Sequence, residues 1–217
     1  MIKRLAQTSQ SPYLPHDLLW GFAPRHLPAD APTWVAEALC VEPPVVVRRA
    51  QGVAGMIAVG VRGQSRDQRF ACWMPLTAVT GCVRPEQLIE LQQARKQRDW
   101  PLFEALAQLT GPLNQSGLRW GICGSLGFQL ASAIEVTHPA SDLDLLIRAE
   151  RPMSRSQAKT LLALLDNAPA AVDVQLQCPA GAVALREWAS GSSKVMLKTQ
   201  TQPLLVSDPW AHECAVA

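Results

Sequence analysis

Two aspartates one residue apart, Asp142 and Asp144, stand in a hydrophobic segment, residues 141–147. Successive side chains of a strand point to opposite faces, so residues i and i+2 share a face. If this segment is a strand, both carboxylates face one way and the hydrophobic residues between and after them turn toward a core. Two adjacent negative charges repel each other unless a cation lies between them. Mg²⁺ prefers such oxygen ligands and is typically held by one or two carboxylates together with substrate phosphates.

The alternative for this pair is a solvated edge strand, on which both carboxylates face water and bind nothing. Two further features favour the metal site. Gly124-Ser125 stands at a predicted strand-to-helix turn, and Asp173 lies on the polar face of a later predicted strand. Taken singly, a Gly-Ser pair before a helix is usually a cap, and an isolated strand aspartate usually faces solvent. The three features in this order, each on its expected type of element, indicate an active site.

Each of these residues has a physical role in metal-dependent nucleotidyl transfer. Gly124 lets the backbone approach a phosphate closely. Ser125, at the start of a helix, offers a hydroxyl and main-chain N–H groups to an anion, and the helix dipole favours negative charge there. Asp142 and Asp144 would hold two Mg²⁺ ions, and Asp173 would hold the ion that activates the attacking oxygen. The predicted catalytic residues and metal ligands are therefore these three aspartates.

The composition limits the class of protein. Hydrophobic residues make up 48% of the 217 residues, enough for a core, and the net charge is +2. This charge argues against a general basic surface for long nucleic acid. The six cysteines show no CxxC pair and no zinc-type spacing. No apolar run approaches the roughly 20 residues that span a bilayer, and residues 1–7 lack the apolar core of a signal peptide. We expect a cytoplasmic, thiol-reduced protein without membrane or nucleic-acid partners.

Residues 1–80 have the pattern of a small domain of α+β or mostly-β character. Short segments rich in β-branched and bulky residues alternate with Gly, Gln and Ser, as in an antiparallel meander. One short helix is predicted at 33–39, with Thr33 as its cap and Pro43-Pro44 beyond its end. The predicted strands are 45–49, 56–62 and 69–74.

In residues 81–217 predicted helices and strands alternate. Helical segments begin near Leu88 and at Pro101, a residue tolerated in the first helical turn. The predicted strand 171–177 alternates cleanly, with Asp173 on its polar side. The other predicted strands are 118–123, which follows Gly111-Pro112, then 141–147, 194–199 and 203–206, and the other predicted helices are 126–136, stopped by His138-Pro139, then 156–167 and 182–189.

The central motifs resemble the DNA polymerase β-like nucleotidyltransferase superfamily, whose signature is a Gly-Ser turn, an Asp-x-Asp strand and a third Asp. The chain carries further motifs of this kind: His16-Asp17-Leu18-Leu19-Trp20, Gly124-Ser125-Leu126-Gly127-Phe128-Gln129, Ser141-Asp142-Leu143-Asp144-Leu145, Val172-Asp173-Val174-Gln175 and the tail Lys198-Thr199, Pro203-Leu204-Leu205-Val206 and Asp208-Pro209-Trp210. Together these motifs resemble a narrower family, the holo-acyl-carrier-protein synthases of malonate decarboxylase, which are phosphoribosyl-dephospho-CoA transferases. The central motifs are typical of the superfamily, and the two terminal ones are specific to the family.

One departure from the superfamily is the gap of 16 residues between Ser125 and Asp142, which is longer than many nucleotidyltransferases use. The resemblance implies an α+β fold. A small mostly-β N-terminal domain, residues 1–80, would bind the substrate or the carrier. A polymerase β-like nucleotidyltransferase domain with a mixed sheet and helices, residues 81–217, would carry catalysis.

In that family the donor is 2'-(5''-triphosphoribosyl)-3'-dephospho-CoA, and the acceptor is a serine of the acyl-carrier subunit of malonate decarboxylase. The serine oxygen attacks the α-phosphorus, diphosphate leaves, and a phosphodiester-linked prosthetic arm remains. The resemblance implies Mg²⁺ as the cofactor, held by Asp142, Asp144 and Asp173. Asp173 could also assist deprotonation of the serine, and Gly124 and Ser125 would grip the leaving phosphates.

Cations near the site would neutralise the diphosphate, because this chemistry is mainly positioning and charge neutralisation. Lys194 and Lys198 lie four residues apart on a predicted strand, so they share a face and are the predicted substrate-binding cations. Arg148, just after the aspartate strand, is a further candidate. Each of these could equally be a solvated surface cation. His16 could touch the donor or the carrier, and a structural hydrogen bond is the simpler interpretation.

Two other functions stay open at this point. One is another polymerase β-like transferase with a different nucleotide donor and a small-molecule or RNA acceptor. The other is a non-catalytic nucleotide-binding or interaction module. The near-neutral charge disfavours RNA, and the presence of Ser125 together with all three carboxylates disfavours an inactive module.

Overall fold

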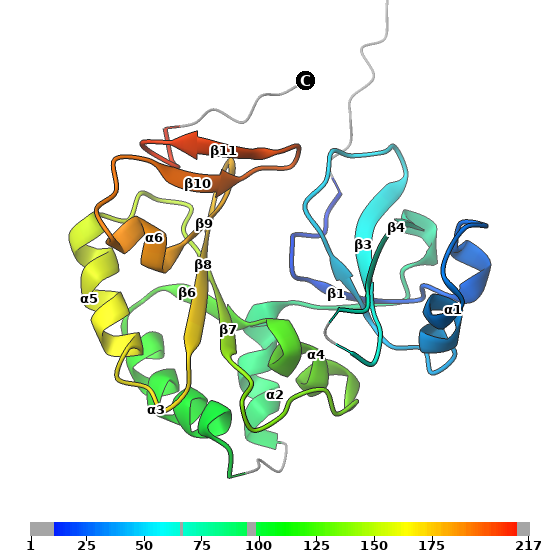
Figure 1. The fold of residues 1–217 in the computed structure, drawn as a ribbon, viewed down its shortest axis with the longest axis horizontal. Helices are drawn as coiled ribbons and strands as arrows, with labels where there is room; N and C mark the ends of the chain where they lie inside the picture. Colours follow the sequence, from blue (N-terminus) through cyan, green and yellow to red (C-terminus); the bar gives the residue numbers. More distant parts are fainter. Residues whose placement is uncertain (1–10, 66, 95–98, 212–217) are drawn as a thin grey trace, which may run out of the picture. The chain divides into compact units, whose positions relative to one another are not determined.

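The computed structural model describes residues 11–65, 67–94 and 99–211, and the chain divides into two compact units after Val83 (Figure 1). Residues 1–7 and Cys214, which entered the predictions on a signal peptide and on cysteine spacing, lie outside the described residues. The first unit has an antiparallel sheet and the second a mixed sheet with helices, so the predicted α+β fold class is confirmed.

The first unit is built on one antiparallel sheet with a helix packed against it. Its elements are β1 (Leu18–Trp20), α1 (Thr33–Leu39), β2 (Val45–Val47), β3 (Met56–Arg62), β4 (Arg69–Pro75) and β5 (Gly81–Val83), with 3-10 turns at Pro24–His26 and Leu76–Ala78. The strand order is β4-β3-β2-β1-β5, and β2, β3 and β4 form the predicted meander. Helix and sheet close a hydrophobic core in which Leu19, Val35, Val45 and Val59 are fully buried.

Helix α1 has the predicted bounds but not the predicted cap. Pro32 occupies the N-cap position, and Thr33 is the first helical residue, with no side-chain cap bond. The carbonyl of Pro32 accepts the N–H of Val35 at 2.9 Å. Pro32 has φ −57° and ψ 144°, so its main chain already directs the following residues into the helix. A capping hydroxyl from Thr33 is therefore not required.

The second unit is built on a six-stranded mixed sheet. Its strands are β6 (Arg119–Ile122), β7 (Leu143–Arg148), β8 (Val172–Cys178), β9 (Gly181–Ala184), β10 (Val195–Lys198) and β11 (Pro203–Val206). Its helices are α2 (Leu88–Ala94), α3 (Pro101–Gln115), α4 (Gly124–Ser132), α5 (Arg155–Leu165) and α6 (Leu185–Ala189), preceded by a 3-10 turn at Pro85–Gln87. The strand order is β11-β10-β9-β8-β7-β6. β7 and β8 run parallel and the other neighbours run antiparallel.

Helices cover both faces of this mixed sheet. In Figure 1, α3, α5 and α6 lie on one side of the sheet and α2 and α4 lie on the other. None of the helices in the described ranges is long and apolar enough to cross a membrane. Helix α3 shows how the sequence builds this layer, because its buried residues recur every three or four positions. They are Leu102, Phe103, Ala105, Leu106, Leu109 and Leu113.

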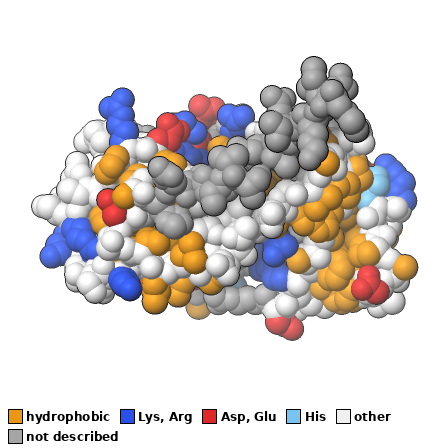
Figure 2. All heavy atoms as spheres, turned by 90° about the horizontal axis from the view of Figure 1, so that it is seen from above, with side chains coloured by type: hydrophobic (Ala, Val, Ile, Leu, Met, Phe, Trp, Pro, Cys, Tyr) orange, Lys and Arg blue, Asp and Glu red, His pale blue; other side chains and the backbone are white. Residues whose placement is uncertain are grey.

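The edge strand β11 leaves hydrophobic side chains at the surface. Figure 2 looks onto the side that carries β10 and β11, and hydrophobic side chains are visible there on the left. Met196 and Leu205 are cross-strand partners and are 38% and 62% exposed. The strand is four residues long and starts with Pro203, which cannot donate a ladder hydrogen bond. A short strand with a proline limits pairing with the edges of other molecules.

Helix α3 continues through Gly111-Pro112, the pair that precedes the predicted strand 118–123, and ends at Gln115. Proline lacks one N–H and therefore weakens a single turn. Leu109 and Leu113 are buried on either side of it, with exposed fractions of 0% and 1%. Packing of this face outweighs the local signal of the Gly-Pro pair.

Helix α4 spans Gly124–Ser132 rather than the predicted 126–136. Ala133 adopts a left-handed conformation with φ +63°, which ends the helix. The side-chain oxygen of Gln129 then accepts hydrogen bonds from the main-chain N–H groups of positions 136 and 137, both at 3.0 Å. Such local side-chain bonds compete with helical ones. His138-Pro139 is therefore not what stops the helix.

The predicted helix 182–189 is also wrong in its first half. Gly181–Ala184 forms strand β9, and only Leu185–Ala189 is helical. β9 lies between β8 and β10, where it pairs with both neighbours. Tertiary pairing overrides the helical preference of this alanine-rich segment.

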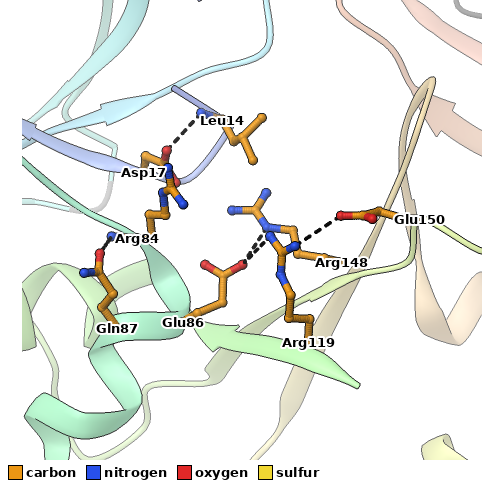
Figure 3. Close-up of polar contacts among 8 residues, drawn as sticks. All are labelled: Leu14, Asp17, Arg84, Glu86, Gln87, Arg119, Arg148 and Glu150. Atoms are coloured by element: carbon orange, nitrogen blue, oxygen red, sulfur yellow. Dashed lines mark hydrogen bonds and ion pairs between the residues drawn. The ribbon is translucent and has the colours of Figure 1, made fainter. Parts of the chain in front are cut away.

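An ion-pair network joins β6, β7 and the start of the unit (Figure 3). Arg119 and Arg148 are directly opposite each other on β6 and β7, an arrangement of like charges that is unfavourable by itself. The carboxylate of Glu86 accepts a hydrogen bond from Arg148 Nε at 2.8 Å and lies 3.5 Å from Arg119 Nη2. Arg119 also pairs with Glu150 at 3.2 Å. The side chain of Arg148 is only 3% exposed, so Glu86 offsets a buried charge.

We expect Glu86→Gln to lower the free energy of unfolding by about 3 kcal/mol at pH 7, because it removes the carboxylate partner of buried Arg148. Burial alone would raise the pKa of Glu86. The hydrogen bond and charge of Arg148, with the charge of Arg119, outweigh burial and lower this pKa from its usual 4.5. The stabilisation is therefore present above pH 4.5 and is lost as pH falls through the lower folded-state pKa.

Urea unfolding of wild type and Glu86→Gln between pH 3 and pH 7 measures this effect. The difference in stability should shrink below pH 4.5. The matched control is Glu150→Gln, which changes a carboxylate that is 76% exposed and should have little effect. Equal stabilities of wild type and Glu86→Gln at pH 7 would contradict the proposed role of the network.

Candidate active site

The Gly-Ser turn lies against the second aspartate of the pair. The chain leaves β6 at Cys123, whose N–H donates to the main-chain oxygen of Asp144 at 2.9 Å. Gly124 follows with φ +62°, a conformation that L residues rarely adopt. A Cβ at this position would overlap the carboxylate of Asp144. Glycine is therefore required here on two grounds, and Ser125 follows in the first turn of α4.

Asp142 stands immediately before β7 rather than inside it. The turn that precedes it is closed by His138 and Ser141, since the N–H of His138 donates to Ser141 Oγ at 2.9 Å and the N–H of Ser141 donates to the His138 carbonyl at 2.9 Å. Leu143 is fully buried, whereas Asp142 and Asp144 are half-buried. The predicted alternation therefore holds across the start of the strand.

The parallel pairing of β7 with β8 brings the third aspartate to the pair. Asp173 is the register partner of Asp144. One carboxylate oxygen from each of Asp142, Asp144 and Asp173 lies within 4.8 Å of the others. Asp173 is exposed and the other two are half-buried. This set of oxygen donors fits a hard cation such as Mg²⁺, which compensates the repulsion among three carboxylates.

The two predicted substrate-binding lysines lie on β10 and just before it. Lys198 pairs with Ala182, which pairs with Gln177, so these three side chains face the same side of the sheet as Asp173. Gln177 is four residues from Asp173 along β8, about 13 Å at the usual rise of a strand. Lys194 lies in the bend just before β10, so it is not on the strand that carries Lys198. Both lysines are exposed.

Arg148 and His16, the other basic residues considered, are engaged elsewhere. Arg148 is the buried partner of Glu86. His16 belongs to the first unit, where its Nε2 lies 3.4 Å from Arg49 Nη1. Its neighbour Asp17 accepts the N–H of Leu14 at 2.9 Å (Figure 3). The contacts of His16 and Asp17 thus hold the residues that lead into β1.

The tail motif Asp208-Pro209-Trp210 also has a structural role. Asp208 Oδ1 accepts the N–H of Trp210 at 2.9 Å. The indole N–H of Trp210 donates to the carbonyl of Ala149 at 2.7 Å, and its ring packs edge-on against Trp188 with centroids 5.2 Å apart. These contacts hold the end of the described chain against the residue that follows β7.

A cavity of about 440 Å³ adjoins the third carboxylate. Its wall consists of residues 165, 166 and 168–173, which connect α5 to β8, together with Arg186 of α6. Arg186 Nη2 donates a hydrogen bond to Asp166 Oδ1 at 2.7 Å. Sequence reasoning missed Arg186, because its partner stands far away in the sequence and no spacing pattern connects the two.

An α+β fold with three converging carboxylates beside a Gly-Ser helix start has the features of a metal-dependent transferase. Two family models match the chain. The "Phosphoribosyl-dephospho-CoA transferase MdcG N-terminal domain" matches residues 14–85, and the "Phosphoribosyl-dephospho-CoA transferase MdcG C-terminal domain" matches residues 89–209. The chain belongs to the phosphoribosyl-dephospho-CoA transferase family, and its prediction as a transferase enzyme is confirmed.

Several curated relatives are similar over most of the chain. A phosphoribosyl-dephospho-CoA transferase of Pseudomonas aeruginosa is 53% identical over 196 residues, which cover 90% of this chain and 93% of that protein. One of Pseudomonas putida is 52% identical over 91% of this chain and 95% of its own length. One of Azotobacter vinelandii is 50% identical over 93% of this chain and 96% of its own length. No solved structure matches the chain.

Proposed function

We propose that the chain transfers the phosphoribosyl-dephospho-CoA group from 2'-(5''-triphosphoribosyl)-3'-dephospho-CoA to a serine of the apo acyl-carrier subunit of malonate decarboxylase, with release of diphosphate. Membership of the family supports the type of donor. The observation that carries the chemistry is the convergence of Asp142, Asp144 and Asp173 within 4.8 Å. The reaction is an in-line displacement at phosphorus, for which this donor set is suited.

In the proposed reaction the serine hydroxyl loses its proton to Asp173, and its oxygen forms a bond to the α-phosphorus of the donor. The bond between that phosphorus and the diphosphate breaks, and diphosphate leaves with the electron pair. Asp142, Asp144 and Asp173 would hold Mg²⁺, which when bound neutralises phosphate charge and makes the hydroxyl more acidic. Gly124 and Ser125 would bind the leaving phosphates through main-chain N–H groups and the serine hydroxyl.

Two lysines are proposed to bind the anionic donor. Lys194, exposed just before β10, is proposed to contact phosphate groups of the donor. Lys198 shares a face of the sheet with Asp173 further along the strands, and is proposed to contact parts of this long donor that extend beyond the triphosphate. Their ammonium groups supply charge neutralisation, which is the main requirement of phosphoryl-group chemistry.

The two predicted domains are proposed to have different functions. Residues 1–80 would bind the substrate or the carrier, and residues 81–217 would carry catalysis. The near-neutral charge of the chain supports a reaction without nucleic acid. We place the reaction in the cytoplasm, in line with the absence of disulfides among the described cysteines.

The test is to incubate the protein with triphosphoribosyl-dephospho-CoA, Mg²⁺ and the apo carrier, and to weigh the intact carrier by mass spectrometry. We expect a single mass increase equal to one phosphoribosyl-dephospho-CoA group, with one diphosphate released per carrier. Carrier with its target serine replaced by alanine and reactions with EDTA are the controls. An unmodified carrier, with ATP or CTP consumed by transfer to a small molecule instead, would favour the alternative nucleotidyltransferase.

A further inference from the structure

The cavity beside Asp173 touches only one part of the proposed catalytic centre. Its wall contains Asp173, whereas Asp142, Asp144, Gly124 and Ser125 are not part of it. The cavity therefore adjoins the residue whose carboxylate is proposed to accept the proton of the attacking serine. It does not open next to the helix start proposed to bind the leaving phosphates.

In-line displacement decides which reactant approaches from this side. The attacking and leaving oxygens stand roughly opposite each other at phosphorus. With the leaving diphosphate at Gly124 and Ser125, the acceptor has to enter from the side of Asp173. The cavity offers such an entrance for a group larger than a water molecule, at about 440 Å³.

The chemistry of the wall argues against the donor as the occupant. Its ionisable side chains are two carboxylates, Asp166 and Asp173, and one guanidinium, Arg186, so a triphosphate would meet more negative than positive charge. None of the described residues that line the wall carries an aromatic ring on which the adenine could stack. The other side chains are small or aliphatic, including those of Ala168, Ala170 and Ala171, which leaves room for a polypeptide segment.

Arg186 lines this cavity, and its guanidinium has more N–H donors than its hydrogen bond to Asp166 uses. A guanidinium carries five N–H donors, and Asp166 is the one hydrogen-bond partner of this side chain within the described part of the chain. The Arg186 side chain is 60% exposed. Asp166, through its hydrogen bond and its charge, and then Asp173, through its charge, raise the pKa of Arg186.

We infer that this cavity receives the segment of the acceptor polypeptide that carries the target serine, and that Arg186, positioned by Asp166, donates hydrogen bonds to oxygen atoms of that segment. The inference rests on the proposed function, because it requires a protein acceptor. Arg186 is then an acceptor-binding residue, and Asp166 is a positioning residue that acts through it.

Steady-state kinetics with the purified full chain test this inference. We expect Arg186→Ala to raise the KM for the apo carrier about tenfold, with the KM for the donor and kcat within about twofold of wild type. Asp166→Asn should move the carrier KM in the same direction by a smaller factor. Ala170→Phe, which fills the cavity without removing charge, should also raise the carrier KM. Carrier binding without donor, measured by fluorescence anisotropy, should weaken in parallel.

Matched controls come from exposed positions on helix α5. Lys159→Ala removes another cation, and Ala163→Phe places the same ring on the surface; both should retain the wild-type carrier KM. An increase in the donor KM with an unchanged carrier KM would overturn the inference and assign Arg186 to the donor phosphates. Unchanged kinetics in Arg186→Ala and Ala170→Phe would also overturn it. If wild type itself leaves the carrier unmodified, the proposed function fails instead, and the two failures are thereby distinguished.

Discussion

Asp144→Ala is expected to reduce Mg²⁺-dependent transfer by about 10³-fold or more, with the fold intact. Asp144 stands between the other two carboxylates, since it shares a face with Asp142 and is the register partner of Asp173. Metal-supplied charge stabilisation contributes several kcal/mol to such reactions, and each 1.36 kcal/mol is tenfold in rate. Because the side chain is half-buried at the edge of the site, its loss leaves the hydrophobic face of β7 in place.

The measurement is the rate of carrier modification by intact-mass spectrometry at saturating Mg²⁺, combined with calorimetric titration of Mg²⁺ or Mn²⁺ into the protein. Asp142→Ala should behave in the same way. Asp99→Ala, at an exposed position outside the site, is the control and should match wild type. A wild-type rate of carrier modification by either Asp144→Ala or Asp142→Ala would contradict the proposal of a carboxylate metal site.

Gly124→Ala is expected to lower kcat by about 10²-fold, because the new methyl group would displace the carboxylate of Asp144. A small misplacement of a catalytic group can cost this much. The substitution also strains the backbone, since Gly124 has φ +62° and an alanine there costs roughly 1–2 kcal/mol. The two effects are separable, because strain lowers stability whereas displacement of Asp144 lowers turnover.

Gly117→Ala is the matched control, since Gly117 has φ +70° and nothing lies within 4 Å of a Cβ built there. Both variants should lose similar stability in thermal unfolding. Only Gly124→Ala should lose turnover and bind Mg²⁺ more weakly. If the two variants keep equal turnover, the contact between position 124 and Asp144 has no catalytic consequence.

Patterns confined to one element were predicted well from the sequence. The alternation that begins at Val172 identified a strand and its buried face. The one that begins at Leu143 identified the strand β7, although both faces of that strand are buried after Asp144. The meander of β2, β3 and β4 followed from short β-branched segments separated by turn residues. These predictions succeed because the periodicity of side-chain directions is a property of the local backbone.

The errors arose where contacts beyond the element decide the conformation. Gln129 ends helix α4 by binding main-chain groups that lie outside it. The segment Gly181–Ala184 is a strand because β8 and β10 stand on either side of it. Tertiary packing acts in the same way where helix α3 passes through Pro112, because Leu109 and Leu113 are buried. In each case, local propensity is worth less than the tertiary contacts that oppose it.

For the candidate site, the sequence alone determined the chemical types and the local geometry: a Gly-Ser helix start, two carboxylates on one face, and a third carboxylate on the polar face of a later strand. Only the tertiary structure decided that they meet, because parallel pairing places Asp173 beside Asp144. It also decided that position 124 must be glycine, through the contact with Asp144. The pairing of Arg186 with Asp166 beside Asp173 was likewise invisible in the sequence, since it depends on where α5, β8 and α6 run in space.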